Sequence, residues 1–396
     1  MILKVIDAGC GVGKTTAMIN FMNEQPEERK FLYITPFLSE VERVKESCKL
    51  KKFKAPEEIP NKSDDFLRLI SKGENISSTH ALFQKVTAAI LDLIQFQNYT
   101  LIIDEAADVV GEVDITQSDL KTIISQYTEI KEDGSLEWCA EDYSGRFEDY
   151  KNMIELGFVK AHSSSKGETF SLIKTFPIKI FEAFKEVYIL TYMFNGQKAY
   201  YEYNNVDIRY LYVKDFHITE TPQKYDYSKQ KALISVVDDD KLNAIGEGRG
   251  SLSVAWFKRN SNSPLMKQLK NNLYNFFRNK TNSKAKENLW TTFKEYKKQL
   301  QGKGYTNSFV PISIRATNEY RETTAVAYLA NRYMVPTLKH FFEKSGIEVD
   351  EESFALSELI QFVYRSAIRD GKPITVYIPS KRMRDLFVDW LSKKNE

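Results

Sequence analysis

The sequence predicts an α/β fold of two domains, each with a parallel β-sheet that helices cover on both faces. Short apolar runs, which are typical of fully buried strands, alternate along the chain with longer runs that are typical of helices. This alternation weakens over residues 196–250 and then starts again. With 396 residues, the chain is long enough for two or three domains of ordinary size. We therefore expect a first domain over residues 1–215 and a second over residues 230–396.

The first half is predicted to contain four buried strands and two helices. The strands are the apolar segments LKVIDAG, KFLYITP, YTLIIDEA and VYILTYMF. The helices are TTAMINFMNEQ, after the first strand, and LSEVERVKESCKL, after Pro36 has ended the second strand. Residues 115–175 differ from this pattern because they are polar. We interpret them as an insertion or a mobile excursion before the fourth strand.

The second half is predicted to repeat the alternation. The expected strands are GSLSVAWF, SFVPISI and ITVYIP. One or two basic helices are expected over residues 264–301, and further helices over TTAVAYLANRYM, LSELIQFVYRSAI and KRMRDLFVDWLSKK. Between the two halves, GQKAYYEYNNVDI is interpreted as a strand or a hairpin, and DDDKLNAIGEGRG as a loop.

The composition is that of a globular protein without a membrane partner. Hydrophobic residues make up 42% of the chain and charged residues 28%. No apolar run approaches the ~20 residues that cross a bilayer, and the N-terminal apolar run is too short for a signal peptide. The three cysteines lie far apart and the four histidines do not cluster, so neither a disulfide framework nor a transition-metal site is expected. A cytoplasmic protein fits these features.

Charge is distributed unevenly along the chain, although the net charge is only +2. Residues 1–230 hold 28 Lys and Arg against 36 Asp and Glu, whereas residues 231–396 hold 28 against 18. This asymmetry indicates that the second half contacts a polyanion, with an ordinary solvated surface as the alternative. In residues 258–303, lysines are interleaved with Tyr, Phe and Trp, as in grooves that hold single strands. We expect these lysines to contact nucleic-acid backbone and the aromatic side chains to lie in the core.

The stretch DAGCGVGKTTA, residues 7–17, matches the phosphate-binding pattern of Ala or Gly, four residues, and then Gly-Lys-Ser/Thr. Its glycines allow backbone N–H groups to turn inward around phosphate oxygens, and the helix that follows directs its positive end at the same place. In this pattern the lysine contacts the β- and γ-phosphates and the threonine hydroxyl binds Mg²⁺. We therefore predict that ATP and Mg²⁺ are bound by Ala8, Gly9, Gly11, Gly13, Lys14, Thr15 and Thr16.

An acidic pair, Asp104 and Glu105, stands at the end of the buried strand LIID. Ligands of parallel α/β sheets bind beyond the carboxyl ends of the strands, so we expect this pair to lie beside the phosphate loop. Asp104 is predicted to hold Mg²⁺ through water, and Glu105 to orient and deprotonate the attacking water. The alternative is that both acids cap the next helix.

Several segments, in order along the chain, resemble the motifs of helicase superfamilies one and two. The whole pattern is most similar to the compact helicase-like proteins of bacteriophages, with the DEAx form of superfamily 2. AGCGVGKT resembles motif I, and DEAA resembles motif II. ILTYMF resembles motif III, which implies that Thr191 couples the nucleotide state to domain closure. YITPFLSEVERV and STHALF resemble two motifs that touch nucleic-acid backbone, which implies contacts from Thr35, Pro36, Thr79 and His80.

The resemblance is looser in the second half. QFVYRSAIR resembles motif VI, which implies that Gln361, Arg365 and Arg369 act at the nucleotide and that one arginine reaches the γ-phosphate. The two arginines are four residues apart, which places both on one face of the predicted helix. SLSVAWFKR and IRATNEY stand where motifs IV and V belong, which implies nucleic-acid contacts from Lys258, Arg259, Arg315 and Asn318.

The resemblance implies two RecA-like P-loop NTPase domains with an ATP cleft between them. It implies an ATP hydrolase of the helicase or translocase type that moves on or unwinds nucleic acid. Single-stranded DNA is the favoured partner, with RNA as the alternative, in phage replication or recombination inside the host cytoplasm. A replication or recombination protein is a further expected partner. A second hypothesis is a nucleotide-dependent switch or loader that acts on a protein partner without separating strands.

Overall fold

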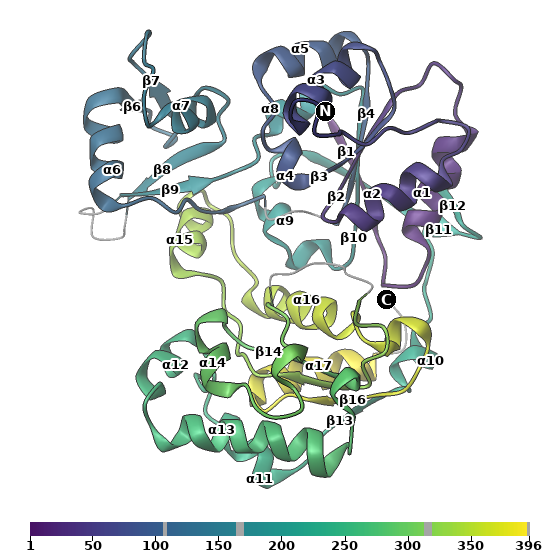
Figure 1. Ribbon diagram of the computed structural model, residues 1–396, viewed down its shortest axis with the longest axis vertical. Coiled ribbons are helices and arrows are strands. Elements are labelled where there is room, and N and C mark those ends of the chain that lie inside the picture. Colours follow the sequence, from purple (N-terminus) through teal and green to yellow (C-terminus); the bar gives the residue numbers. More distant parts are fainter. Residues whose placement is uncertain (106–108, 164–169, 313–318, 394–396) are drawn as a thin grey trace. The chain divides into compact units, whose positions relative to one another are not determined.

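The chain divides into two compact units. The computed structural model describes residues 1–105, 109–163, 170–312 and 319–393 (Figure 1). The first unit comprises Met1–Ala8, Gly13–Pro222 and Val335–Val349, and the second comprises Gly9–Val12, Gln223–Met334 and Asp350–Glu396. These units differ from the expected domains mainly because Val335–Val349, from the second half of the sequence, packs in the first unit.

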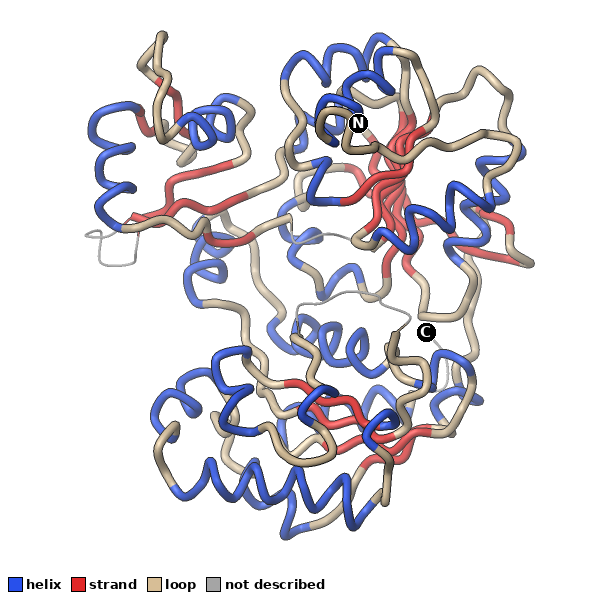
Figure 2. Tube along the Cα trace, in the orientation of Figure 1, coloured by secondary structure: helices blue, strands red, loops and turns tan. Residues whose placement is uncertain are grey.

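A seven-stranded sheet forms the centre of the first unit, with the strand order β12-β11-β1-β10-β4-β2-β3. Neighbouring strands are parallel, except that β11 and β12 form an antiparallel hairpin. Figure 2 shows helices on both sides of this sheet, which is why the predicted strands are almost continuously apolar. The strands are β1 (Ile2–Asp7), β2 (Phe31–Thr35), β3 (Ile76–Thr79), β4 (Thr100–Asp104), β10 (Glu186–Thr191), β11 (Asp207–Lys214) and β12 (His217–Thr219).

The helices of the first unit include the two that the sequence predicts, α1 and α2. The expectation of a strand or hairpin over GQKAYYEYNNVDI is wrong in its first part, because residues 198–202 are helical and only the last two residues begin β11. The helices are α1 (Lys14–Glu24), α2 (Leu38–Ser47), α3 (Lys62–Ser71), α4 (His80–Phe83), α5 (Ala88–Phe96), α8 (Ile178–Glu182), α9 (Lys198–Glu202) and α15 (Pro336–Lys344).

The predicted insertion is a folded subdomain of the first unit, and its described residues are not an irregular excursion. A three-stranded sheet of order β5-β9-β8 and a β6-β7 hairpin pack with two helices around a small apolar core that contains Leu120, Ile123 and Phe147. Tyr127 and Trp138 stack at 5.4 Å between ring centroids. The elements are β5 (Gly111–Glu112), α6 (Gln117–Thr122), β6 (Thr128–Ile130), β7 (Leu136–Trp138), α7 (Glu148–Glu155), β8 (Val159–Ser163) and β9 (Phe170–Lys174).

The second unit contains a four-stranded parallel sheet with the order β13-β16-β15-β14. This confirms the predicted fold class of two α/β domains with parallel sheets. The strands are β13 (Ile234–Val236), β14 (Asn288–Thr291), β15 (Ala325–Tyr328) and β16 (Ile374–Tyr377). The helices are α10 (Ser228–Lys231), α11 (Asp240–Asn243), α12 (Val254–Asn260), α13 (Pro264–Asn275), α14 (Lys297–Leu300), α16 (Glu351–Val363) and α17 (Lys381–Ser392).

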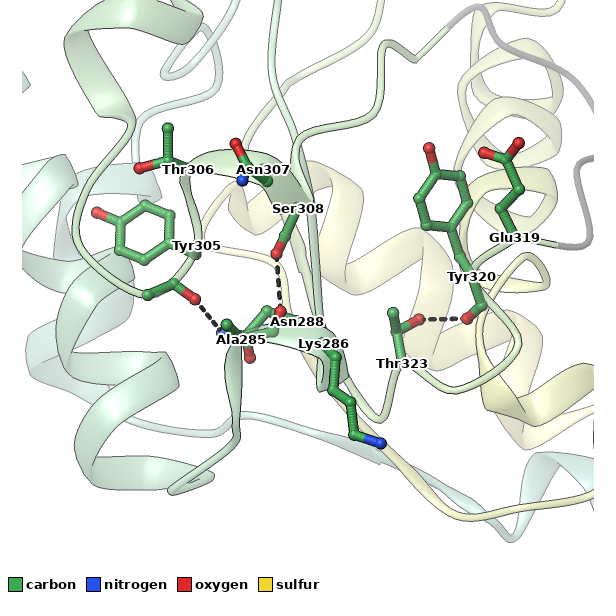
Figure 3. Close-up of a pocket in the computed structure, with 11 residues that line it drawn as sticks. Ala285, Lys286, Asn288, Tyr305, Thr306, Asn307, Ser308, Glu319, Tyr320 and Thr323 are labelled. Carbon is green, nitrogen blue, oxygen red and sulfur yellow. Dashed lines mark hydrogen bonds between the residues drawn. The ribbon is translucent and has the colours of Figure 1, made fainter.

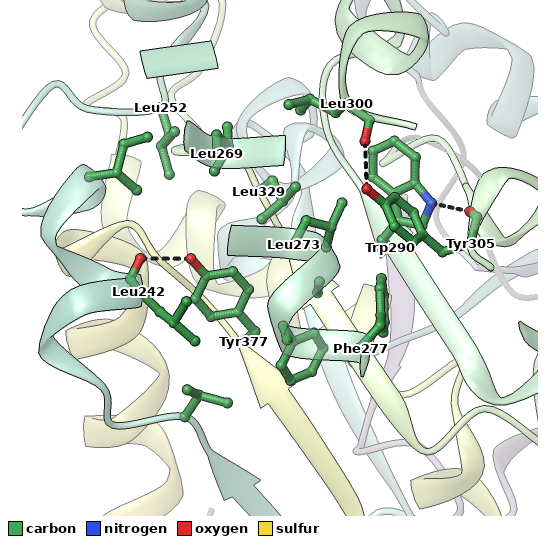
Figure 4. Close-up of a cluster of buried hydrophobic side chains, with 14 of the residues drawn as sticks. Leu242, Leu252, Leu269, Leu273, Phe277, Trp290, Leu300, Tyr305, Leu329 and Tyr377 are labelled. Carbon is green, nitrogen blue, oxygen red and sulfur yellow. Dashed lines mark hydrogen bonds between the residues drawn. The ribbon is translucent and has the colours of Figure 1, made fainter. Parts of the chain in front are cut away.

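The core of the second unit includes Phe277 and Trp290 from the basic 258–303 stretch (Figure 4), whereas Tyr274 of the same stretch is 45% exposed. Helix α13 buries Met266, Leu269 and Leu273, which share one helix face. Trp290 is fully buried, and its indole N–H donates to the Tyr305 carbonyl at 2.8 Å. The expectation that the aromatic residues of this stretch lie in the core is thus confirmed for the largest of them.

Several predicted elements of the second unit are wrong. GSLSVAWF is not a strand, because the Ser253 hydroxyl accepts from the Trp256 N–H at 3.3 Å and so caps α12. TTAVAYLANRYM contains β15, whose residues are all buried between two neighbouring strands, and the predicted helix is absent there. Residues 264–301 contain β14 as well as helices. DDDKLNAIGEGRG contains the short helix α11, and the described part of SFVPISI lies outside the named strands. Among the described residues, no helix is long and apolar enough to cross a membrane.

Candidate functional site

The carboxyl ends of five parallel strands of the first unit meet along one edge of its sheet. The strand register pairs Asp7 with Thr191 between β1 and β10, and Leu190 with Asp104 between β10 and β4. It also pairs Thr35 with Thr79 between β2 and β3. Residues that the sequence singles out at separate strand ends are therefore brought to a common edge by the sheet.

The phosphate loop joins the end of β1 to the start of α1. Gly13 caps α1 with a φ of +91°, and Gly11 has a φ of +89°, which is a backbone conformation that favours glycine. The Lys14 ammonium donates to the Ala8 carbonyl at the start of the loop. Thr15 and Thr16 lie in the first turn of α1. Gly9 packs with the second unit, where its N–H donates to the Tyr227 hydroxyl at 2.7 Å.

Asp104 is the centre of a small polar cluster at the end of β4. Its side chain accepts from the Tyr33 hydroxyl at 2.6 Å and from the Thr15 hydroxyl at 3.3 Å. The His80 ring nitrogen Nε2 lies 3.2 Å from the Asp104 carbonyl oxygen. Only 7% of Asp104 is exposed. The cluster thus joins the phosphate loop, the end of β4 and the start of α4.

Burial raises the pKa of the Asp104 carboxyl to about 6, and the neighbouring Glu105 charge acts in the same direction. The hydrogen bond from Tyr33 acts in the opposite direction, because it stabilises the carboxylate. A cation bound beside Asp104 would hold it ionised at neutral pH. A hydroxyl and a carboxylate 3.3 Å apart suit Mg²⁺, which is usually held by one or two carboxylates together with phosphate oxygens and water.

Glu105 follows Asp104 with a φ of +60°, in the left-handed region that non-glycine residues rarely adopt. Its N–H donates to the Leu190 carbonyl at 2.9 Å, so β10 holds this conformation. Backbone strain of this kind is concentrated at functional sites. Glu105 is half-buried.

Thr191 is fully buried at the end of β10 and takes part in a network that tethers β1. Its hydroxyl accepts from the Gln197 amide at 2.7 Å, and its carbonyl accepts from the Ala8 N–H at 3.1 Å. The carboxylate of Asp7, the residue before Ala8, accepts from the Phe194 N–H at 3.0 Å. Hydrogen bonds thus connect the end of β10 to Asp7 and Ala8, the first residues of the predicted phosphate loop.

Sequence reasoning missed three polar residues of this edge, namely Tyr33, Asp7 and Gln197. Tyr33 is in a strand that otherwise reads as apolar, and its hydroxyl would need a partner once the ring is buried. Asp7 immediately precedes the phosphate loop, and its position at a strand end is the only available signal. Gln197 has no signal in the sequence, because its bond to Thr191 depends on the path of the chain after β10.

The expected backbone-contacting residues of the first unit differ in accessibility. Thr35 is 1% exposed, whereas Pro36 and His80 are half-buried. Thr79 caps α4 by accepting from the Leu82 N–H. A groove of about 620 Å³ begins at Thr79 beyond the end of β3, and two lysines contribute to its wall. The groove is lined by Glu58, Pro60, Asn61, Lys62, Ser63, Thr79, Ala81, Leu82 and Lys85.

The expected arginine pair of the second unit does not lie on one helix face. Helix α16 ends at Val363, so Arg365 follows its end and Arg369 lies in a separate 3₁₀ turn, Ala367–Asp370. Arg365 is 3% exposed, and its guanidinium lies 5.4 Å from the centroid of the Phe362 ring. Arg369 and Gln361 are half-buried.

The other expected contacts of the second unit lie on an exposed helix or outside the described residues. Lys258 and Arg259 are exposed in the last turn of α12. Arg315 and Asn318 lie outside the described residues. A pocket of about 450 Å³ lies near the amino end of β14 (Figure 3). Its Ser308 hydroxyl donates to the Ala285 carbonyl at 3.0 Å, so this polar group already has a partner within the unit.

Comparison with known proteins gives a close relative and a shared fold. The SPbeta prophage-derived uncharacterized protein YonV of Bacillus subtilis (strain 168) is 39% identical over 414 residues, which cover 99% of both chains. The family described as the YonV C-terminal Rossmann-like domain matches residues 228–391. An apo XPD structure has a TM-score of 0.54 and 15% identity, and covers 98% of this chain and 95% of its own. An XPD helicase structure has a TM-score of 0.52 and 11% identity, with 98% and 94% covered. The chain thus has the fold of the XPD RecA-like domains.

Proposed function

The chain belongs to the family of the prophage-derived protein YonV, and we propose that it is an ATP-dependent helicase or translocase that acts on nucleic acid. The polar cluster of Thr15, Asp104 and Tyr33, beside a phosphate loop at the carboxyl edge of a parallel sheet, carries this proposal. Ligands of open α/β sheets bind at this edge. The XPD-like fold over nearly the whole chain supports a motor over a simple kinase.

Each residue of the edge has a role in hydrolysis under this proposal. The loop amides and Lys14 bind the phosphates, and Thr15 and Asp104 hold Mg²⁺, directly or through water. When bound there, Mg²⁺ would neutralise charge on the β- and γ-phosphates. Glu105 orients the attacking water and accepts its proton. Tyr33 keeps the buried Asp104 ionised by donating a hydrogen bond to it.

The second domain supplies the remaining candidates. Arg365 and Arg369 are proposed as sources of the positive charge that stabilises the transferring phosphoryl group, and Gln361 precedes them on α16. Such an arginine acts only while the nucleotide is intact, so hydrolysis changes the attraction between domains. Repeated change of this kind steps a two-domain protein along a strand. The buried network of Thr191 at β10 is a proposed route by which loop and nucleotide state are coupled.

Nucleic acid is proposed to bind along the same edge of the first unit, in the groove that begins at Thr79. Lys62 and Lys85 line this groove, and Asn61 and Ser63 add neutral donors. Phosphate backbones are recognised by side chains of these types without regard to sequence. Single-stranded DNA is the favoured partner, with RNA as the alternative.

The decisive experiment measures ATP turnover without nucleic acid and with single-stranded DNA, duplex DNA or RNA in parallel. We expect single strands to raise the rate. Lys14→Ala should abolish turnover and leave DNA binding intact, because the proposed role of Lys14 is to bind phosphate of the nucleotide and not DNA. Lys49→Ala, at an exposed lysine outside the proposed motifs, is the matched control. If Lys14→Ala hydrolyses ATP as fast as wild type, the proposed nucleotide site is wrong. If no nucleic acid changes the rate of turnover, a nucleotide-dependent switch acting on a protein is favoured.

A second experiment tests the groove. The double variant Lys62→Ala/Lys85→Ala should weaken single-strand binding and reduce the slope of log affinity against log salt by up to about two, since each lost phosphate contact contributes about one. Lys72→Ala, an exposed lysine after α3, is the control. An unchanged salt dependence in the double variant would mean that the nucleic acid binds elsewhere on the protein.

A further inference from the structure

A tight hairpin brings an aromatic side chain to the phosphate loop. Strands β11 and β12 are joined by Asp215 and Phe216, and the ladder closes with Lys214 opposite His217. Both turn residues have positive φ, +48° and +59°, which is the pattern of a type I′ turn. Such turns normally use Asn-Gly or Asp-Gly, because non-glycine residues are strained there. A phenylalanine in the second position therefore needs another explanation.

The first unit holds this turn against α1 by polar contacts. The Asn20 side-chain amide donates to the Phe216 carbonyl at 3.1 Å, and His217 lies 3.3 Å from the Glu24 carboxylate. Figure 1 shows β12 beside α1. These contacts fix the backbone of the turn, so the position of the phenyl ring is set by the helix that starts at the phosphate loop.

The ring of Phe216 lies directly against Gly13. A Cβ atom on Gly13 would stand 2.7 Å from Phe216 Cδ1, so the absence of a side chain at Gly13 is what admits the ring. Even so, 55% of Phe216 is exposed, so much of its ring is open to solvent. A mainly exposed aromatic ring thus stands beside the residue whose backbone turns into the proposed phosphate site.

We propose that Phe216 is the stacking platform for the base of the bound nucleotide. The inference rests on the proposed function, because it takes the loop at Gly13 as the phosphate site. Under this proposal the phosphates lie in the loop and the base stacks on the exposed part of the Phe216 ring, which packs against Gly13. The hairpin follows the phosphate loop by some two hundred residues, so base recognition here does not depend on residues upstream of the loop.

Stacking recognises the π-face of a base and not its hydrogen-bonding edge, so it tolerates any base. We therefore expect adenine and guanine nucleotides to bind with similar affinity, and an inorganic polyphosphate to gain nothing from Phe216. This difference between ligands with and without a base is what separates the proposed role from simple support of the loop.

The test compares binding of AMP-PNP, GMP-PNP and inorganic tripolyphosphate, each with Mg²⁺, by calorimetry. Phe216→Leu keeps an apolar side chain and removes the aromatic face. It should weaken both nucleoside analogues about tenfold, which equals ~1.4 kcal/mol, and leave tripolyphosphate within about twofold of wild type. Phe216→Trp should bind the analogues at least as tightly as wild type. Phe96→Ala, at a phenylalanine that is 80% exposed on α5, is the control and should change nothing.

Three outcomes would overturn the inference. Equal loss for tripolyphosphate and the analogues in Phe216→Leu would mean that the ring shapes the loop and does not touch the base. Unchanged analogue binding in Phe216→Leu would mean that the base lies elsewhere. If Lys14→Ala binds all three ligands as wild type does, the nucleotide site itself is wrong, and the inference fails with it. Only this last result also refutes the proposed function.

Discussion

The substitution Asp104→Asn should stabilise the first unit at neutral pH while removing the group that holds the cation. Asp104 is buried, and its pKa in the folded chain is about 6, against an ordinary value of 3.8. The asparagine side chain has the same shape and keeps an oxygen that accepts from Tyr33 and Thr15. The substitution therefore removes the buried charge with little change in packing.

The magnitude follows from the shift in pKa. A carboxyl whose pKa is raised by folding binds protons more tightly in the folded chain, so its ionisation opposes folding. A shift of about two units corresponds to about 3 kcal/mol. The penalty is absent below pH 3.8, grows as the pH rises through about 6, and is complete above that. Asp104→Asn should gain up to about 3 kcal/mol at pH 7.5 and nothing near pH 4.

The assay is urea unfolding of wild type and variant over pH 4.5–8, followed by circular dichroism. Hydrogen exchange at the amides of β4 assigns the change to the first unit. The expected signature is a stability difference that grows with pH. A variant that is no more stable than wild type at pH 7.5 would refute the reasoning, because the buried carboxylate would then cost nothing.

Asp65→Asn is the matched control, and it should change stability in the opposite direction. Asp65 is 2% exposed, and burial alone would raise its pKa. Hydrogen bonds from the Glu57 N–H at 2.9 Å and from Arg68 at 2.7 Å outweigh burial, so the pKa is lowered. This carboxylate stabilises the fold above pH 3.8, and the contribution is lost as the pH falls through the lowered value. Its asparagine variant should be destabilised at pH 7.5.

Three further changes test other parts of the first unit. Tyr33→Phe should destabilise the chain by about 1.5–3 kcal/mol at pH 8, where Asp104 is charged, because hydrogen bonds to charged groups are stronger. The loss should be smaller at pH 5, and urea unfolding at both pH values measures the difference. The pKa of His162 is lowered by burial and by the charges of His340 and Lys344, with Glu112 opposing them, so its stabilising effect is present above pH 6.5 and lost below. The protection factors of the α15 amides against hydrogen exchange should fall from pH 7.5 to 5.5 in wild type, and fall less in His162→Gln. Gly13→Ala should lower the free energy of unfolding by about 1–2 kcal/mol or more, because alanine is strained at the positive φ of Gly13 and its Cβ would meet the Phe216 ring. Adding Phe216→Ala should recover only the part due to the ring. Thermal unfolding of both variants measures this.

Predictions from the sequence succeeded where the local pattern determines the structure. The apolar strands of the first unit were predicted from continuous hydrophobic runs, since a parallel sheet covered on both faces leaves no polar face. The strand-to-helix phosphate loop was predicted from its glycines and lysine, and φ values of +89° and +91° show why glycine is needed at two of its positions. The carboxyl edge as the meeting place of Asp104 and Thr15 followed from the general topology of parallel sheets.

Predictions failed where tertiary packing outweighs local preference. The sequence around residues 325–328 predicted a helix, but these residues are completely buried between β14 and β16 and form a strand. The apolar residues of the polar stretch 115–175, such as Leu120 and Phe147, are widely spaced in the sequence. They form a core only in the folded subdomain, so the local pattern did not predict it. The helix expected to carry both Arg365 and Arg369 ends at Val363, so their spacing of four does not make them neighbours.

By itself, the sequence determined the fold class, the glycine-rich turn between β1 and α1 and the acidic strand end, because each depends on residues that are close together in the chain. Only the tertiary structure decided which side chains complete the site. Tyr33 bonds to Asp104 across neighbouring strands, and Phe216 reaches Gly13 from a hairpin at the other end of the first domain. Such pairs join residues that are 71 and about 200 positions apart, and no local pattern specifies them because the sheet order sets the contact.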